Sequence, residues 1–205
     1  FSAVEIPPNI VIKPPWITYQ SQKNQILIEI TPRMAFGTGT HETTQLCLEF
    51  LSCVVKQNDH VLDVGTGSGI LAVAAAKLGA IKVLGIDIDD NAIQNGQENV
   101  RQNKVENTVR IKYGSIKTVS GQYDVICANM DRKTLISILT TLKSLLCPEG
   151  HLILSGILKS ETNTILESAA ETNLAVMEEK VRGEWAAFLL AVPVKQRIGS
   201  TDEYD

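Results

Sequence analysis

The chain has 205 residues, a formal net charge of −4 and a hydrophobic fraction of 44%. Its length suits one α/β domain with a full core. The acidic balance argues against a broad nucleic-acid-binding face, which would be strongly basic. Its apolar runs are shorter than the roughly 20 residues that a membrane-spanning helix needs. We therefore expect a domain that contacts neither a membrane nor nucleic acid.

The N-terminal part is rich in proline, with four of the seven prolines in its first 20 residues. It predicts an extended linker over 1–24 that runs into a strand at 25–30. It has no basic segment followed by a continuous apolar run, so it does not resemble a signal peptide. The first residue is not Met, and we expect the sequence to begin partway into a longer protein.

The stretch AFGTGTHETTQLCLEF at 35–50 predicts a loop followed by a helix, because its apolar residues recur at helical spacing. Thr40 is the expected N-cap of this helix. Its capping box is incomplete, since Thr43 stands where Glu or Gln is usual.

From residue 60 onward, strand and helix patterns alternate. The expected strands are 60–65, 82–87, 109–114, 123–130 and 150–157, and the expected helices are about 69–79, 90–103, 132–146 and 160–172. Continuous apolar strands between helices predict a parallel sheet covered on both faces. The last two strand-like runs meet at Arg182-Gly183-Glu184 without a helix, which predicts an antiparallel hairpin. We expect an α/β, doubly wound, mostly parallel seven-stranded sheet over 25–194 and a polar tail at 195–205.

Cysteine and histidine spacings indicate neither disulfides nor a metal site. The four cysteines form no CxxC pair and lie in or beside apolar segments, which predicts buried free thiols in a reducing cytoplasm. The three histidines are scattered and make no metal-binding motif. These residues are Cys47, Cys53, Cys127, Cys147, His41, His60 and His151.

A glycine-rich loop follows the strand at 60–65 and opens the next helix. Its glycines are Gly65, Gly67 and Gly69, and Asp63 lies two residues before the first. The dinucleotide fingerprint requires its third glycine at position 70, where this chain has Ile70. This D-x-G-x-G-x-G form resembles motif I of the class I S-adenosylmethionine-dependent methyltransferases. The resemblance implies S-adenosylmethionine as cofactor, whose ammonium group suits a carboxylate-rich site.

Asp87 ends the next strand, 22 residues after Gly65. A carboxylate at this position can accept hydrogen bonds from both hydroxyls of a ribose. Nicotinamide-dependent oxidoreductases use an acid in the same way, so Asp87 alone leaves that class open. The antiparallel C-terminal hairpin favours the methyltransferase fold.

Asn129 ends the strand at 123–130, beside the edge where open α/β sheets bind ligands. Methyl transfer to nitrogen needs a neutral amine whose lone pair is aligned with the methyl group. The side-chain carbonyl of Asn129 and the main-chain carbonyl of Met130 can accept hydrogen bonds from such an amine and orient it. The alternative is that Asn129 only forms a turn at the strand end. Asp131 and Arg132 are expected to begin the following helix.

Taken together, these stretches resemble one family, the bacterial ribosomal protein methyltransferases that modify large-subunit protein eleven. AFGTGTHETTQLCLEFL is the most specific match, and VLDVGTGSGILAVAAAKLGA, VLGIDIDDNAI, VICANM and HLILSGIL follow in order. The resemblance implies methylation of lysine ε-amines and the N-terminal α-amine of the ribosomal protein. It also implies an N-terminal recognition domain that this chain lacks. The cofactor contacts that it implies are Thr44, Gly65, Asp87 and Asn129, with Phe36, Thr40 and His41 walling the methionine end.

Three points depart from the family pattern or stay open. Gly114-Ser115 stands where an acid often reaches the adenine, so we expect the Ser115 hydroxyl, the backbone or apolar contacts to hold that ring. Asn-Met-Asp replaces the more usual Asn-Ile-Leu after the strand at 123–130. His41 is either a packing residue or part of the active-site wall. The alternative functions are a small-molecule amine methyltransferase and a non-catalytic S-adenosylmethionine-binding module.

Overall fold

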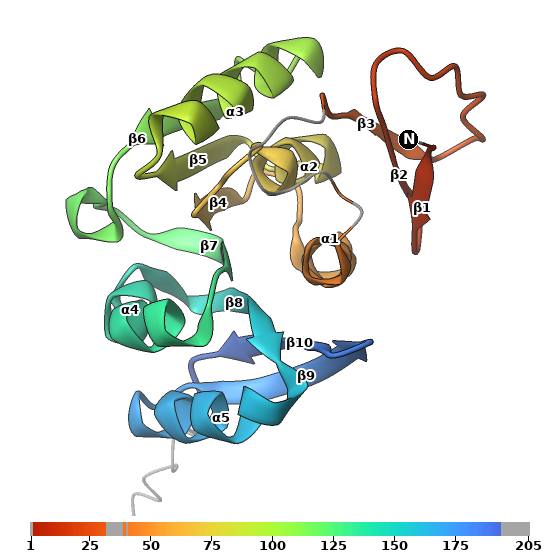
Figure 1. Cartoon of the computed structure of the whole chain (residues 1–205). Coiled ribbons are helices and arrows are strands. Elements are labelled where there is room, and N and C mark those ends of the chain that lie inside the picture. The colour runs from red at the N-terminus through yellow and green to blue at the C-terminus, as the bar shows by residue number, and fades with distance from the viewer. Residues whose placement is uncertain (1, 32–38, 40, 194–205) are drawn as a thin grey trace, which may run out of the picture.

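A seven-stranded sheet forms the centre of the protein (Figure 1). The structure is a computed structural model that describes residues 2–31, 39 and 41–193. The strand order is β6-β5-β4-β7-β8-β10-β9, and β10 runs antiparallel to both of its neighbours. The predicted doubly wound sheet and its C-terminal hairpin are thus confirmed. The strands are β4 (His60–Val64), β5 (Lys82–Asp87), β6 (Val109–Tyr113), β7 (Tyr123–Asn129), β8 (Leu146–Leu158), β9 (Ala175–Arg182) and β10 (Trp185–Ala191).

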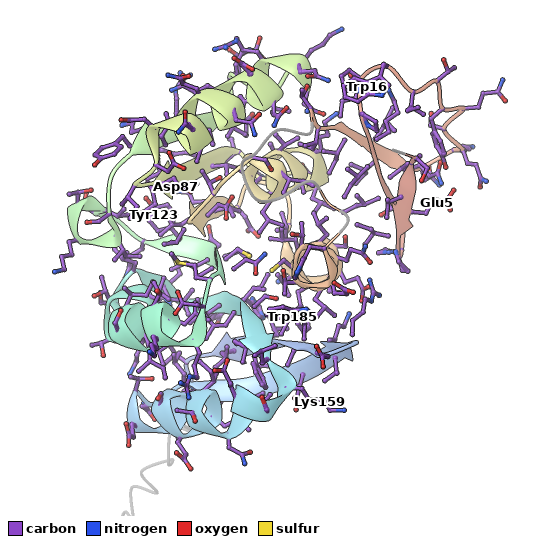
Figure 2. All side chains as sticks on the ribbon, in the orientation of Figure 1. Glu5, Trp16, Asp87, Tyr123, Lys159 and Trp185 are labelled. Atoms are coloured by element: carbon purple, nitrogen blue, oxygen red, sulfur yellow. The ribbon has the colours of Figure 1, made fainter. Side chains whose placement is uncertain are left out.

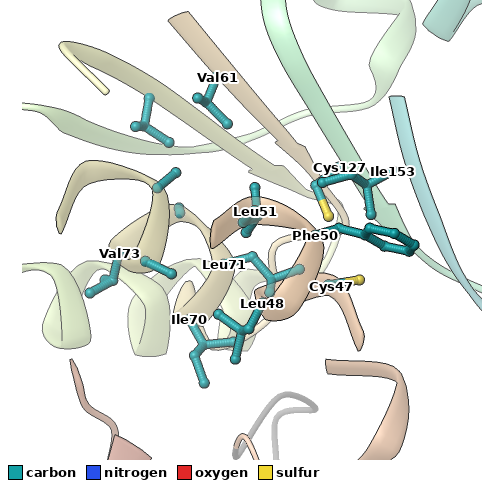
Figure 3. Close-up of a cluster of buried hydrophobic side chains, with 14 of the residues drawn as sticks. Cys47, Leu48, Phe50, Leu51, Val61, Ile70, Leu71, Val73, Cys127 and Ile153 are labelled. Atoms are coloured by element: carbon teal, nitrogen blue, oxygen red, sulfur yellow. The ribbon is translucent and has the colours of Figure 1, made fainter. Parts of the chain in front are cut away.

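Helices cover both faces of this sheet, as its continuous apolar strands require. One face packs against α1 (Glu42–Val54), α2 (Ile70–Leu78) and α3 (Asp90–Gln102), and the other packs against α4 (Arg132–Ser144) and α5 (Thr162–Glu171). Alternate strand residues point to opposite faces, so Val61 belongs to the first core and Leu62 to the second. Figure 3 shows the first core, where Phe50 and Cys47 of α1 lie beside Cys127 and Ile153 of the sheet.

Two short 3-10 helices complete the helical elements. They are η1 (Ile116–Thr118) and η2 (Lys159–Glu161).

The N-terminal segment forms a second, three-stranded sheet in place of the expected linker. Its strands are β1 (Val4–Ile6), β2 (Ile10–Lys13) and β3 (Ile26–Glu29), with β2 in the middle. The expectation of an extended linker over 1–24 was wrong for β1 and β2. Their isoleucines are buried, and this sheet packs on the outer side of α1 and α2. The free energy gained by burying these isoleucines outweighs the tendency of the prolines to interrupt strands. The predicted tail at 195–205 lies outside the described residues.

Several local boundaries also differ from the sequence analysis. The N-cap of α1 is His41 rather than Thr40, because the His41 side chain accepts a hydrogen bond from the backbone N–H of Thr43. Strand β8 begins at Leu146 rather than 150, because Leu146 pairs with Tyr123 directly after α4 ends.

The cysteines are free, as expected, but they are not all buried. Cys47 and Cys127 are buried and Cys147 is half-buried, whereas Cys53 is exposed. Cys53 lies on the helical face of α1 that points away from the core.

Candidate functional site

Two neighbouring cavities lie at the carboxyl ends of β4, β5 and β7. One has a volume of about 290 Å³ and includes Thr44, Gly67 and Asn129 in its lining; the other has a volume of about 150 Å³ and includes Ser115. Gly65, Asp87 and Met130 line both cavities. The two cavities are therefore adjacent, and these shared residues lie between them. In open α/β sheets this edge is where ligands bind.

The glycine-rich loop between β4 and α2 depends on backbone conformations that favour glycine. Gly65, Gly67 and Gly69 have φ values of +71°, +53° and +77°. Gly65 and Gly67 line the larger cavity. Gly69 is the N-cap of α2 and does not line either cavity. A Cβ on Gly69 would lie 3.2 Å from the Cα of Gly96, so this glycine allows α2 and α3 to pack closely.

Asp87 is held between the cavities by backbone hydrogen bonds. Its Oδ2 accepts from Gly67 N at 2.9 Å, and its Oδ1 accepts from Ile88 N at 2.8 Å and Asp89 N at 3.1 Å. Figure 2 shows Asp87 at the end of β5. Carboxylate oxygens have about four acceptor positions in total, so Asp87 keeps acceptor capacity for a ligand while it fixes the glycine loop.

Asp63 lies beneath the loop and away from the cavity surface. Its side chain is buried, its Oδ2 accepts a hydrogen bond from Thr66 Oγ1 at 2.6 Å, and it lines neither cavity. Burial raises the pKa of the Asp63 carboxyl to about 7, and the charge of Asp87 adds to the rise. Asp63 therefore supports the glycine-rich loop through Thr66, and a direct contact of Asp63 with the cofactor stays a prediction.

Asp63→Asn should gain stability relative to the wild type as the pH rises from 4 to 8. The ordinary pKa of the carboxyl is 3.8 and the folded value is about 7. Between these values the unfolded chain releases a proton that the folded protein keeps, so the wild type loses stability as the pH rises. Asparagine cannot titrate and lacks this loss. Urea denaturation at pH 4, 6 and 8 measures the difference, and a constant gap between the two proteins would contradict a raised pKa.

The smaller cavity has an apolar lining. It is lined by Ile88 from the loop between β5 and α3, Ile116 of η1 and Ile138 of α4, together with Ser115. Ile88 is 70% exposed, which is unusual for a large aliphatic side chain. An exposed aliphatic residue beside an apolar cavity suits a flat aromatic ligand. The sequence analysis named Ser115 but missed the isoleucines. The position of Ile88 directly after Asp87 was the one feature of the sequence that could have indicated them.

The larger cavity brings Thr44 and Asn129 together from α1 and β7. Thr44 is buried, and its Oγ1 has no hydrogen-bond partner among the described residues. His41 caps α1, and its ring lies edge-on to Trp185 of β10 with 5.0 Å between ring centroids. Figure 2 shows Trp185 beside α1. The predicted contacts Phe36 and Thr40 lie outside the described residues.

Asn99 of α3 is a further residue that the sequence analysis missed. Its Nδ2 donates to the main-chain oxygen of Ser68 at 2.8 Å, and its Oδ1 accepts from Thr31 N at 3.1 Å. Both bonds are buried or half-buried, so Asn99 joins the glycine loop to the segment that follows β3. The sequence carries no signal for this role, because it depends on the burial of Asn99, which only the structure shows.

The family model described as ribosomal protein L11 methyltransferase (PrmA) matches residues 1–192. The chain belongs to this family. A relative of that name from Alkaliphilus oremlandii is 44% identical over 193 residues, which cover 94% of this chain and 62% of the relative. Another of the same name, from Halalkalibacterium halodurans, is 38% identical over 190 residues, covering 92% of this chain and 61% of the relative. The chain thus spans about three fifths of the length of the curated relatives that it matches.

Solved structures agree with this family membership. The crystal structure of ribosomal protein L11 methylase from Lactobacillus delbrueckii subsp. bulgaricus has a TM-score of 0.88 and 32% identity, and the match covers 94% of this chain and 99% of that one. The Bacillus subtilis tRNA methyltransferase TrmK has 17% identity and a TM-score of 0.61, and the match covers 71% of this chain and 65% of that one. This likeness shows a shared fold alone. The family and the fold imply S-adenosylmethionine as the methyl donor.

Neither a helix that could span a membrane nor a metal-binding cluster is present among the described residues. None of the helices there is long and apolar enough to cross a membrane. The same residues contain no group of three or more His, Cys, Asp or Glu side chains that would hold a metal ion.

Proposed function

We propose that this chain is the catalytic part of an S-adenosylmethionine-dependent N-methyltransferase that acts on ribosomal protein L11. Its acceptors are the ε-amines of lysines and the N-terminal α-amine. The observation that carries the proposal is the pair of adjacent cavities with Asp87 between them, in a chain that belongs to this methyltransferase family. The relatives in this family are named for the same substrate.

The described residues fit the cofactor in three parts. The apolar cavity with Ser115 suits the adenine ring, and the acceptor position that Asp87 keeps suits a ribose hydroxyl. The methionine end fits the larger cavity, where the buried Thr44 hydroxyl has no hydrogen-bond partner among the described residues. Buried polar groups without partners are rare in proteins, so a polar ligand beside Thr44 would account for this one.

Asn129 and Met130 are proposed to bind the acceptor amine. Bound S-adenosylmethionine supplies an electrophilic methyl group on a positively charged sulfur. A lysine amine has a pKa near 10.4 in water and must lose a proton before its lone pair can react. The Asn129 side-chain oxygen and the Met130 main-chain oxygen would accept N–H bonds from the neutral amine and direct its lone pair. Both residues line the larger cavity.

We also propose that recognition of the ribosomal protein uses a region that this chain does not contain. The matched relatives extend well beyond the 61–62% of their length that the chain covers. The free cysteines suit a reducing compartment, so we propose that the protein acts in the cytoplasm.

Transfer of a tritiated methyl group tests the proposal. The chain, and a fusion that adds the N-terminal region of the Alkaliphilus oremlandii relative, are incubated with labelled S-adenosylmethionine and purified ribosomal protein L11. We expect label on lysine and the N-terminal residue, with faster transfer by the fusion.

Two results would contradict the proposal in different ways. Failure of both proteins to transfer label, despite binding of S-adenosylhomocysteine by calorimetry, would favour a non-catalytic binding module. If the chain and the fusion transfer label to free small amines at equal rates, and neither labels L11, a small-molecule amine methyltransferase would be favoured.

A further inference from the structure

The side-chain amide of Asn129 has two ends with opposite chemistry. Oδ1 accepts hydrogen bonds, whereas Nδ2 only donates them. An amine that approaches Nδ2 meets a second donor, while an amine that approaches Oδ1 can donate its own N–H. The orientation of this amide therefore decides whether Asn129 can bind a methyl acceptor.

The orientation can be derived from His41, the N-cap residue of α1. The ring nitrogen Nδ1 of His41 accepts the backbone N–H of Thr43 at 3.3 Å. A ring nitrogen that accepts a hydrogen bond carries no proton of its own. Oε2 of Glu42 lies 4.0 Å from Nδ1, which is too far for a hydrogen bond. The N-cap interaction thus fixes Nδ1 as an acceptor.

The hydroxyl of Thr43 connects this cap to Asn129. Thr43 Oγ1 lies 2.9 Å from His41 Nδ1 and 3.3 Å from Asn129 Nδ2. Since Nδ1 is an acceptor, the single hydroxyl proton of Thr43 is donated to it. Oγ1 then has only lone pairs to offer to Asn129, so the amide must present its Nδ2–H₂ group. The Thr43 side chain is 1% exposed, so water does not replace either partner.

This relay leaves Oδ1 of Asn129 as the group that is available to a ligand. Asn129 lines the larger cavity, and its Oδ1 makes no hydrogen bond within the described ranges 2–31, 39 and 41–193. We propose that Thr43 is a positioning residue, which holds the Asn129 amide with Oδ1 toward the acceptor amine. The proposal rests on the proposed amine methyltransferase function.

Nuclear magnetic resonance of the ¹⁵N-labelled chain tests the relay without any activity measurement. The side-chain amide signals of Asn129 are assigned by their loss in Asn129→Asp. Thr43→Val, which keeps the side-chain shape but removes the hydroxyl, should shift these signals and speed their exchange with water, and Thr43→Ser should restore both.

Ser155→Ala is the matched control for general loosening around Thr43. Ser155 Oγ donates to the main-chain oxygen of Thr43 at 3.1 Å, outside the relay. We expect this variant to leave the Asn129 amide signals in place. Unchanged signals in Thr43→Val, or equal changes in Thr43→Val and Ser155→Ala, would overturn the proposal.

A second pair of variants keeps the test valid if Thr43→Val does not fold. His41→Ala removes the acceptor that orients the Thr43 hydroxyl and should also change the Asn129 amide signals. His41→Asn should restore them, because its side-chain oxygen can accept both Thr43 hydrogen bonds and asparagine is a favourable N-cap. Identical signals in His41→Ala and wild type would overturn the proposal.

Methyl transfer gives the kinetic readout. At saturating cofactor, Thr43→Val should lower kcat by on the order of tenfold to a hundredfold, the loss expected when a reacting group is misplaced. Thr43→Ser and Ser155→Ala should stay close to wild type. If the wild type itself transfers no methyl group, the proposed function fails, while the amide signals still decide the role of Thr43.

Discussion

Asp87→Ala is expected to weaken the binding of S-adenosylhomocysteine by about 1–3 kcal/mol, the cost of losing hydrogen bonds to a charged group. The variant loses the carboxylate that is proposed to accept a hydrogen bond from the ribose. It also frees the backbone N–H of Gly67, which Asp87 Oδ2 accepts at 2.9 Å, so the glycine loop loses one of its attachments. Isothermal titration calorimetry measures the change in Kd.

Asp90→Ala is the matched control for the loss of a negative charge near this site. Asp90 is exposed, lies in the first turn of α3 and lines neither cavity, so its replacement should leave Kd nearly unchanged. An Asp87→Ala protein with wild-type affinity would show that Asp87 does not hold the ribose. Equal losses in the two variants would indicate a nonspecific effect of charge.

Gly156→Ala is expected to destabilise the fold by about 2–5 kcal/mol, combining left-handed backbone strain with overpacking. Gly156 has a φ of +83°, and a Cβ there would lie 2.4 Å from the main-chain oxygen of Met130. The clash involves backbone on both sides and cannot be relieved by a rotamer change. Because the Met130 oxygen is the proposed second acceptor for the amine, methyl transfer should fall as well. Urea denaturation measures the loss of stability.

Gly121→Ala separates the strain from the clash. Gly121 has a φ of +96°, but a Cβ there would meet nothing within 4 Å. We expect a loss of about 1–2 kcal/mol from backbone strain alone and no change in methyl transfer. Similar losses of stability in the two alanine variants would mean that contact with Met130 contributes nothing.

The sequence predicted those features of the site that depend on local chain order. Strand and helix periodicities placed the carboxyl ends of the parallel strands at one edge of the sheet. We therefore expected Gly65, Asp87 and Asn129 to lie close together, and all three line the larger cavity. The role of each residue toward a ligand stays a prediction. Asp63 was harder to place, because motif spacing does not reveal which way a strand residue points.

Nonlocal contacts explain most of what the sequence analysis missed. The strands β1 and β2 are only three and four residues long, and β2 is stabilised by parallel pairing with the distant β3. The apolar cavity combines isoleucines from three separate segments. The link from Thr43 to Asn129 spans 86 residues of sequence. None of these contacts leaves a periodic signal in a single chain.

A crystal structure of the chain with S-adenosylhomocysteine is the most direct measurement of the proposed site. We predict the adenine ring in the cavity lined by Ile88 and Ile116, and a ribose hydroxyl within hydrogen-bond distance of the Asp87 carboxylate. The amino-acid end should lie beside Thr44 in the larger cavity. A ligand bound elsewhere, or one whose ribose does not contact Asp87, would contradict the proposed cofactor site.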